Sequence, residues 1–226
     1  MTSLQVESTR GGQLTVVVQL ALAPPLDVRR GEAAKLETVL PDGEGGVAHG
    51  LLIEVAMQDV YDFFFDVNTG LDARGLERLD DMLRPAIMSG LLSDMLTASL
   101  AKHSRTLTEN AYFNGHPDLI VKGRYPKNSI KAGKDGVEVK ATRKHGGAVD
   151  THGARDQWMC VFVYDVDNET EPAVDRRPML FREVYLAKVT TQDFRKNDRG
   201  ELGTRTATLH RDGISRFRES WLYRVD

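Results

Sequence analysis

The fold of this chain is decided by two short apolar segments, PDLIVK at residues 117–122 and GVEVKATR at residues 136–143. Both are rich in β-branched residues, so each is predicted to form a strand. The Asp-Gly pair that opens the second segment is typical of a tight turn. Side chains two residues apart in a strand point to the same face, and we therefore expect Glu138 and Lys140 to lie side by side.

Charged side chains interrupt both apolar segments. Asp118 heads the first, and Glu138 and Lys140 lie within the second. Charged residues are disfavoured in a β-type run unless one face is wet or functional. Two carboxylates and an ammonium gathered at one place can hold a divalent cation and a water. These are the groups that hydrolysis of a phosphodiester requires. The simpler alternative is an edge strand with a solvated glutamate and lysine.

The clearest predicted helix covers residues 71–102. Thr69 is its candidate N-cap, and Pro85 is expected to kink the helix or split it in two. Its apolar stripe at helical spacing is formed by Leu76, Leu79, Met82, Leu83, Ile87, Leu91, Leu92, Met95, Leu96 and Leu100.

Further strands are predicted at 157–165, 180–189 and 204–209. The first of these is apolar almost throughout, which indicates burial on both faces. Asp212 is expected to cap a C-terminal helix, which would carry Ile214, Phe217 and Trp221.

The first 70 residues are interpreted as an elaboration of the same domain, with strands at 16–20 and 51–67 and a loop at 42–46. Residues 71–226 are then the core. The order of elements predicts a mixed α/β fold in which a central mixed sheet is flanked by helices.

Composition places the chain among ordinary globular proteins, at 41% hydrophobic and 28% charged residues. No apolar run approaches the ~20 residues that span a bilayer. The N-terminus lacks the pattern of a secretory signal, so we expect a cytoplasmic location and no membrane partner. A single cysteine, Cys160, excludes an internal disulfide and a cysteine zinc site.

The net charge of −3 conceals an uneven distribution of charge. Residues 1–100 hold 7 Lys and Arg against 15 Asp and Glu, whereas residues 101–226 hold 23 against 18. Residues 122–144 alone contain eight basic residues and two acids. A basic surface beside the candidate site would suit a polyanionic substrate. The alternative is a solvated loop.

Asp118 after a proline, Glu138-x-Lys140 twenty residues later and an amphipathic helix before them resemble the PD-(D/E)XK nuclease superfamily, whose best-known members are type II restriction endonucleases. The resemblance covers about residues 71–190. It implies a restriction-endonuclease-like core of helix, mixed sheet and helix, with the site at one end. It also implies that Asp118 and Glu138 bind Mg²⁺, for which Mn²⁺ can substitute, and that Lys140 orients or deprotonates the attacking water.

The resemblance further implies an acid on the preceding helix. Glu77 and Asp81 share a face at i and i+4 and are the first candidates as metal ligands. Asp80 and Asp94 are also open, and a solvated helix face is the alternative for each of them.

Contacts to nucleic acid are predicted in two stretches. The loop after the first strand offers Lys127, Lys131 and Lys134. The glycine-rich stretch at 145–157 is expected to contact DNA or to shape the site, through Arg155 and Gln157, with Arg143 and Lys144 just before it. The alternative is an ordinary glycine-rich surface loop. Its two histidines, His145 and His152, lack the compact spacing of a zinc site.

The C-terminal stretch is also basic and aromatic. Its arginines are equally consistent with a DNA-binding face and with an amphipathic closing helix; these residues are Arg205, Arg211, Arg216, Arg218 and Arg224, with His210 beside them.

Together these features predict a Mg²⁺-dependent endonuclease that cuts double-stranded DNA, in a restriction or defence setting. A short palindromic target would require a homodimer, because two-fold sites call for two-fold proteins. The alternatives are a repair, phage or RNA-directed nuclease of the same fold, a catalytically inactive nucleic-acid-binding subunit, and a metal-dependent hydrolase of another kind. The sequence leaves open the recognition sequence, the cut pattern and any activating partner.

Overall fold

The computed structural model describes residues 3–8, 14–19, 51–145, 147–151, 153–196 and 207–225. It opens with an antiparallel hairpin of β1 (Ser3–Ser8) and β2 (Leu14–Gln19). The predicted strand at 16–20 overlaps β2, and the predicted loop at 42–46 lies outside the described residues. Three helices follow, namely α2 (Leu51–Asp72), α3 (Leu79–Met82) and α4 (Pro85–His103).

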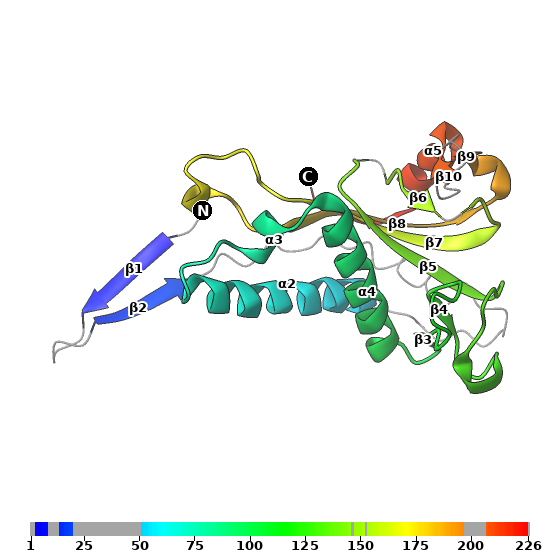
Figure 1. Cartoon of the computed structure of the whole chain (residues 1–226), viewed down its shortest axis with the longest axis horizontal. Coiled ribbons are helices and arrows are strands. Elements are labelled where there is room, and N and C mark those ends of the chain that lie inside the picture. Colours follow the sequence, from blue (N-terminus) through cyan, green and yellow to red (C-terminus); the bar gives the residue numbers. More distant parts are fainter. Residues whose placement is uncertain are drawn as a thin grey trace.

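A six-stranded mixed sheet lies at the centre of the molecule (Figure 1). Its strand order is β11-β8-β7-β5-β4-β3, and every neighbouring pair is antiparallel except β5 and β7, which run parallel. The strands are β3 (Leu107–Glu109), β4 (Leu119–Val121), β5 (Gly136–Thr142), β7 (Gln157–Asp165), β8 (Leu180–Val189) and β11 (Trp221–Arg224). The predicted class, a mixed sheet flanked by helices, is confirmed, and β7 and β8 have the predicted bounds.

Different elements cover the two faces of this sheet. Helices α2 and α4 pack on one face, and a three-stranded sheet with helix α5 (Arg211–Glu219) lies on the other (Figure 1). The small sheet consists of β6 (Asp150–Thr151), β10 (Ala207–Leu209) and β9 (Phe194–Lys196). Short 3₁₀ helices complete the chain: η1 (Pro126–Asn128), η2 (Ala173–Asp175) and η3 (Thr191–Asp193).

Strand alternation decides which residues meet which layer. Val139 of β5 lies beside Cys160 of β7, and both belong to the core under α2 and α4. Their neighbours Met159 and Val161 point to the opposite face, toward α5 and the small sheet. Glu138 pairs with Met159 and Lys140 with Val161, so both charged residues lie on that second face.

Residues 51–67 form most of helix α2, so the predicted strand there is wrong. Ile53, Met57, Val60 and Phe64 recur every three or four residues, and all four are buried in the main core. This is helical spacing, and burial of that stripe against α4 outweighs the strand preference of the aromatic and β-branched residues.

The predicted helix over 71–102 is wrong at its start. Helix α2 continues through Thr69, which is therefore no N-cap, and it ends in a Schellman motif. In this motif Leu76 N donates to Leu71 O and Gly75 N to Asp72 O, with Gly75 in the left-handed region at φ +68. Pro85 begins the separate helix α4, where its missing N–H is of no consequence.

The C-terminal elements also differ from the prediction. The helix there ends at Glu219, and Trp221 begins strand β11 at the edge of the sheet. Asp212 lies in the first turn of α5. Of the predicted strand at 204–209, the structure describes Ala207–Leu209 as β10. Among the described residues, no helix has the length and apolar content that a membrane crossing requires.

Asp80 holds together the junction between α2, α3 and β8. Its side chain is 1% exposed and accepts hydrogen bonds from Asn68 Nδ2 (3.0 Å), Arg78 Nε (3.3 Å) and Met179 N (3.0 Å). Asp80→Ala leaves the buried Met179 N–H without its acceptor and removes the acceptor that holds the half-buried Asn68 and Arg78 side chains, and we expect it to cost about 3 kcal/mol of unfolding free energy. Thermal denaturation should show a melting temperature lower by roughly 6–12 °C. Glu77→Ala, on an exposed loop, should leave it unchanged; an unchanged Asp80→Ala melt would contradict this role.

Candidate active site

The candidate site forms where strand β5 extends beyond its partner β4. The two strands pair only at Val137 and Gly136, so the edge of β5 is open from Glu138 onward. Asp118, one residue before β4, fills the first open position: its Oδ2 accepts a hydrogen bond from Val139 N at 2.8 Å. The N–H and C=O of a strand residue point to the same edge, so the Val139 carbonyl also lies on the side of Asp118.

Helix α4 closes the next position on the same edge. Ser93 Oγ accepts a hydrogen bond from Ala141 N at 2.9 Å and donates to Ser89 O at 2.8 Å. Two side chains, one carboxylate and one hydroxyl, thus satisfy main-chain donors that a neighbouring strand would otherwise pair. The Val139 and Ala141 N–H groups are therefore paired even though β4 ends before them.

The structure brings Asp118, Glu138 and Lys140 together as the sequence predicted. Lys140 Nζ lies 2.7 Å from Glu138 Oε1 and 3.4 Å from Asp118 Oδ2. Glu138 is 8% exposed, while Asp118 and Lys140 are half-buried. The ammonium therefore bridges two carboxylates at the rim of the sheet.

His116 joins this cluster and was missed in the sequence. Its Nδ1 lies 2.7 Å from Glu138 Oε2, and the ring is 8% exposed. Main-chain bonds hold the residue in place, since His116 N donates to Lys131 O and Gly133 N donates to His116 O. His116 precedes Asp118 by only two residues, so the two side chains are close in the sequence. That spacing was a usable signal.

Burial and charge oppose each other in this cluster. Burial alone would raise the pKa of Glu138, but the His116 hydrogen bond and the Lys140 charge lower it to about 2. Burial raises the pKa of Asp118, and the Glu138 charge adds to this against the opposing charge of Lys140. Burial would lower the pKa of Lys140, but the two carboxylates outweigh it and raise the pKa. Glu138 is thus ionised and Lys140 protonated at neutral pH.

The donor set fits a small divalent cation. Asp118 Oδ1 makes no hydrogen bond within the described part of the chain, whereas Glu138 Oε1 and Oε2 contact Lys140 Nζ and His116 Nδ1. The Val139 carbonyl points to the same strand edge as the Val139 N–H whose hydrogen bond Asp118 accepts. These are oxygen ligands, which Mg²⁺ prefers, and Mg²⁺ commonly needs only one or two carboxylates because it retains waters. No group of three or more His, Cys, Asp or Glu side chains is arranged around a common point in the described ranges. The protein would thus supply only a few of the ligands of the metal ion.

The predicted helix acids are not brought to the site. Glu77 lies on the exposed loop before α3, and Asp80 is the structural carboxylate described above. Asp81 pairs with Arg78 (3.7 Å) and Arg176 (3.6 Å). Asp94 is exposed on α4, next to Ser93. The contact that helix α4 makes with β5 at the site is the Ser93 hydroxyl.

The segment between β4 and β5, residues 122–135, is folded, and we call it the β4–β5 lobe. The lysines of the predicted DNA-binding loop project from it. Lys127, Lys131 and Lys134 are exposed, and Lys127 adopts the left-handed conformation at φ +54. The lobe is held by an ion pair of Arg124 with Asp135 at 2.9 Å. These lysines therefore protrude from a fixed surface.

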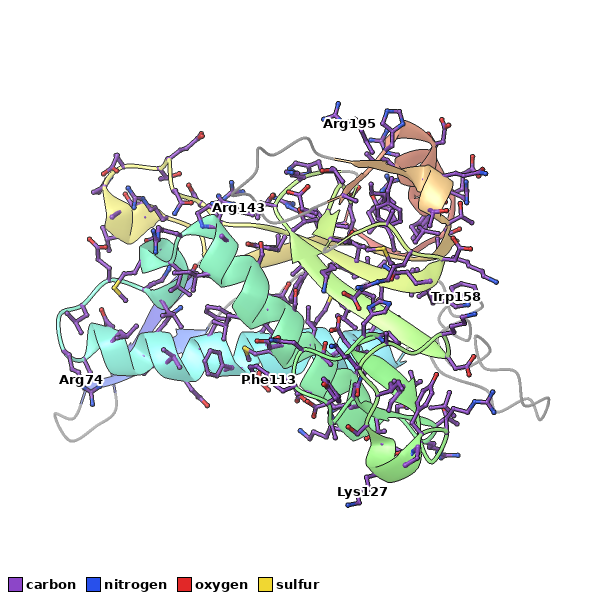
Figure 2. The ribbon with its side chains drawn as sticks, turned by 45° about the vertical axis from the view of Figure 1, so that its right-hand side comes forward. Arg74, Phe113, Lys127, Arg143, Trp158 and Arg195 are labelled. Atoms are coloured by element: carbon purple, nitrogen blue, oxygen red, sulfur yellow. The ribbon has the colours of Figure 1, made fainter. Side chains whose placement is uncertain are left out.

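The other predicted contact residues lie apart from this lobe. Figure 2 shows Arg143 and Lys127 at well-separated places on the molecule. Arg143 donates to Val166 O at 2.8 Å, and Lys144 pairs with Asp150 at 3.6 Å. Arg155 is exposed. The predicted basic residues thus do not form one continuous surface.

Gln157 is buried at the start of β7, on the same sheet face as Glu138, and its Oε1 has no hydrogen-bond partner among the described residues. A buried side chain of this kind cannot reach a base in this conformation. His145 lies 3.4 Å from Asp165 and away from the cluster, and His152 lies outside the described residues.

Comparison with protein-family models, with curated proteins and with solved structures finds no match. The geometry of the cluster is therefore the evidence for function.

Proposed function

We propose that this chain is a metal-dependent endonuclease that hydrolyses phosphodiester bonds in double-stranded DNA, with Mg²⁺ as cofactor and Mn²⁺ as a substitute. The observation that carries the proposal is the cluster at the open edge of β5, where Lys140 Nζ bridges Glu138 and Asp118. We also propose that the core is of the restriction-endonuclease type. The helix before an antiparallel β4–β5 pair and a parallel β7 support this assignment.

Each residue of the cluster has a role in this proposal. Asp118, Glu138 and the Val139 carbonyl would hold Mg²⁺, which supplies an acidified water and neutralises charge on the phosphate. Lys140 would donate hydrogen bonds that orient the attacking water and stabilise the negative charge of the reacting phosphate. Its raised pKa makes it unsuited to act as a free base. His116 would hold the Glu138 carboxylate in one orientation.

The proposed setting is restriction or defence in the cytoplasm, and the rival proposals are a repair, phage or RNA-directed nuclease and an inactive binding subunit. The charged cluster favours an active enzyme, because a binding subunit has no physical need to keep partly desolvated charges together. Incubation of end-labelled duplex DNA, single-stranded DNA and RNA with Mg²⁺ separates these proposals. Discrete duplex fragments support a site-specific endonuclease, RNA fragments an RNA-directed enzyme, and intact substrates the inactive subunit.

Neutralising the lysines of the β4–β5 lobe is expected to weaken DNA binding. If Lys127, Lys131 and Lys134 each contact a phosphate, changing all three to glutamine should reduce the slope of log K against log salt by roughly 2 to 3. Thermal stability should be unchanged, because exposed charges contribute little to it. Fluorescence anisotropy at several salt concentrations measures the slope.

A matched control removes the same charge elsewhere, from the exposed residues Arg74, Arg84 and Lys188. This variant should retain the wild-type slope. If both triple variants behave alike, the lobe is an ordinary solvated surface and not a phosphate contact.

Cleavage of both strands at a two-fold site requires two copies of the cluster, and we expect a homodimer. Light scattering should give about twice the chain mass of 25.2 kDa, in the presence of DNA at the least. A mass of one chain both with and without DNA would remove the dimer from the proposal and leave the nuclease assignment standing.

A further inference from the structure

The loop between β3 and β4 presents two aromatic side chains to solvent. Phe113 is 88% exposed and its neighbour Tyr112 is 42% exposed. Single exposed apolar residues are common on protein surfaces, so the exposure alone decides nothing. The structure of this loop and its position on the molecule are the observations that point to a function for the exposed rings.

The loop is held rigidly by the side chain of Asn110. Its Nδ2 donates to Pro117 O (3.1 Å) and Ile130 O (2.8 Å), and its Oδ1 accepts from Tyr112 N (3.1 Å) and Ile130 N (3.0 Å). This half-buried amide therefore uses all of its hydrogen-bonding capacity to fix both ends of the loop and to tie it to the β4–β5 lobe. A segment so fastened does not fold its tip back onto the protein.

The residues at the tip add to this rigidity. Asn114 adopts the left-handed conformation at φ 55, and Gly115 N donates to Tyr112 O at 2.8 Å to close a tight turn. A Cβ on Gly115 would lie 2.6 Å from Ile130 O and 2.8 Å from Tyr112 O, so only glycine fits. The turn thus directs Phe113 outward in a fixed geometry.

This tip lies beside the candidate active site. Phe113 is three residues before His116, whose ring contacts Glu138. Three residues span at most about 11 Å of chain, and successive nucleotides of a DNA strand are about 3.4 Å apart. Phe113 therefore lies within a few base steps of a phosphate held at the cluster.

The surroundings of the tip suit a polyanion. The loop runs alongside the basic lobe, since Ala111 N donates to Asn128 O and His116 N to Lys131 O. Figure 2 labels Phe113 and Lys127 on this end of the molecule. Lysine is depleted from the cores of protein–protein interfaces, and two aromatic side chains cover far less than a stable interface needs. The charge pattern favours nucleic acid as the occupant.

We propose that Phe113, supported by Tyr112, is a wedge that stacks on or between bases next to the scissile phosphate. This inference rests on the proposed nuclease function and adds to it a residue that deforms the substrate. Exposed apolar side chains that enter a base step unstack it and kink the duplex, and aromatic rings gain stacking energy from any base. The basic lobe would hold the phosphates while the wedge opens the stack at the cut site.

The test uses duplexes that carry 2-aminopurine at successive positions around the cleavage site mapped with the wild-type protein. Binding is measured with Ca²⁺ in place of Mg²⁺, so that the duplex stays intact. Wild type should raise the fluorescence of the probe at one or two positions, because an unstacked 2-aminopurine is brighter. Phe113→Ala should lose that rise and bind roughly tenfold or more weakly. Phe113→Trp should preserve both.

Val174→Ala is the matched control, because Val174 is 85% exposed on η2 in a different part of the chain. It should behave as wild type. If wild type cuts DNA but no probe position responds, or if Phe113→Ala gives the wild-type fluorescence pattern, the wedge is overturned and the nuclease stands. If Phe113→Ala changes only the mass of the protein in solution, Phe113 is a contact between copies and the wedge is again overturned. Failure of the wild type to bind or cut any duplex overturns both proposals.

Discussion

Asp118→Asn is expected to abolish metal-dependent cleavage while leaving the protein folded. The substitution keeps an oxygen that can accept the hydrogen bond from Val139 N, so the geometry of the β5 edge is retained. It removes one of the two charged ligands. A metal contributes several kcal/mol of charge stabilisation, and about 1.4 kcal/mol corresponds to a tenfold change in rate, so the loss should be roughly 10³-fold or more.

The stability of this variant distinguishes lost chemistry from lost folding. The pKa of Asp118 is raised in the folded chain, mainly by burial. A carboxyl with a raised pKa stabilises the fold when protonated, and this stabilisation is lost as the pH rises through the folded-state pKa. Above that pH the charged carboxylate lowers stability, so Asp118→Asn, which carries no charge, should melt at or above the wild-type temperature. A much lower melting temperature would contradict this assignment.

Binding measurements complete the test of Asp118. Mn²⁺ titration followed by electron paramagnetic resonance should show a large loss of affinity in Asp118→Asn, whereas duplex DNA should bind as tightly as in the wild type or more tightly. A negative charge facing phosphates has been removed. Asp135→Asn is the matched control, since Asp135 lies in the β4–β5 lobe and pairs with Arg124. It should retain metal binding and cleavage.

Lys140→Ala is expected to separate turnover from binding. The ammonium lies 2.7 Å from Glu138 and supplies no ligand to a cation, so Mn²⁺ and duplex DNA should still bind. Single-turnover cleavage should fall by roughly 10²-fold or more, which is the scale of one positioned charge or proton-transfer group. Lys188→Ala on the opposite face of the sheet should cut at the wild-type rate. Wild-type turnover in Lys140→Ala would leave the lysine with a structural role only.

Replacing Mg²⁺ with Ca²⁺ should also separate DNA binding from cleavage. Ca²⁺ has a larger and looser coordination shell than Mg²⁺ and positions a water poorly. It should support DNA binding with little cleavage. Equal cleavage rates in the two metals would contradict the proposed role of a tightly ordered water.

Local sequence patterns predicted the central strands of the large sheet. Strands β7 and β8 have long apolar runs bounded by polar residues, and both were predicted with the bounds that the structure shows. Helix α2 was missed because its segment is rich in β-branched and aromatic residues, which are typical of a strand. Its helical character is decided by packing against α4, a separate helix that begins at Pro85. Tertiary burial of this kind is not visible in a short window.

The candidate site likewise contains residues that local sequence patterns predicted and residues that they did not. Asp118, Glu138 and Lys140 were found because their grouping follows from strand alternation and a single hairpin. Ser93 was not found, since it meets Ala141 across 48 residues of sequence and has no motif of its own. The predicted helix acids do not reach the site. Helical spacing shows which residues share a face of a helix, but it does not show what that face packs against. Asp81 pairs with Arg78 and Arg176 instead.

The central claim is that the cluster at the open edge of β5 is a metal-dependent phosphodiesterase site, and plasmid cleavage tests it most directly. Supercoiled DNA is incubated with wild type, Asp118→Asn and Lys140→Ala, each with Mg²⁺ and with a chelator. The account predicts cutting by the wild type that stops when Mg²⁺ is chelated, no detectable cutting by Asp118→Asn and a rate reduced by roughly 10²-fold in Lys140→Ala. Cutting by both variants at the wild-type rate would contradict it.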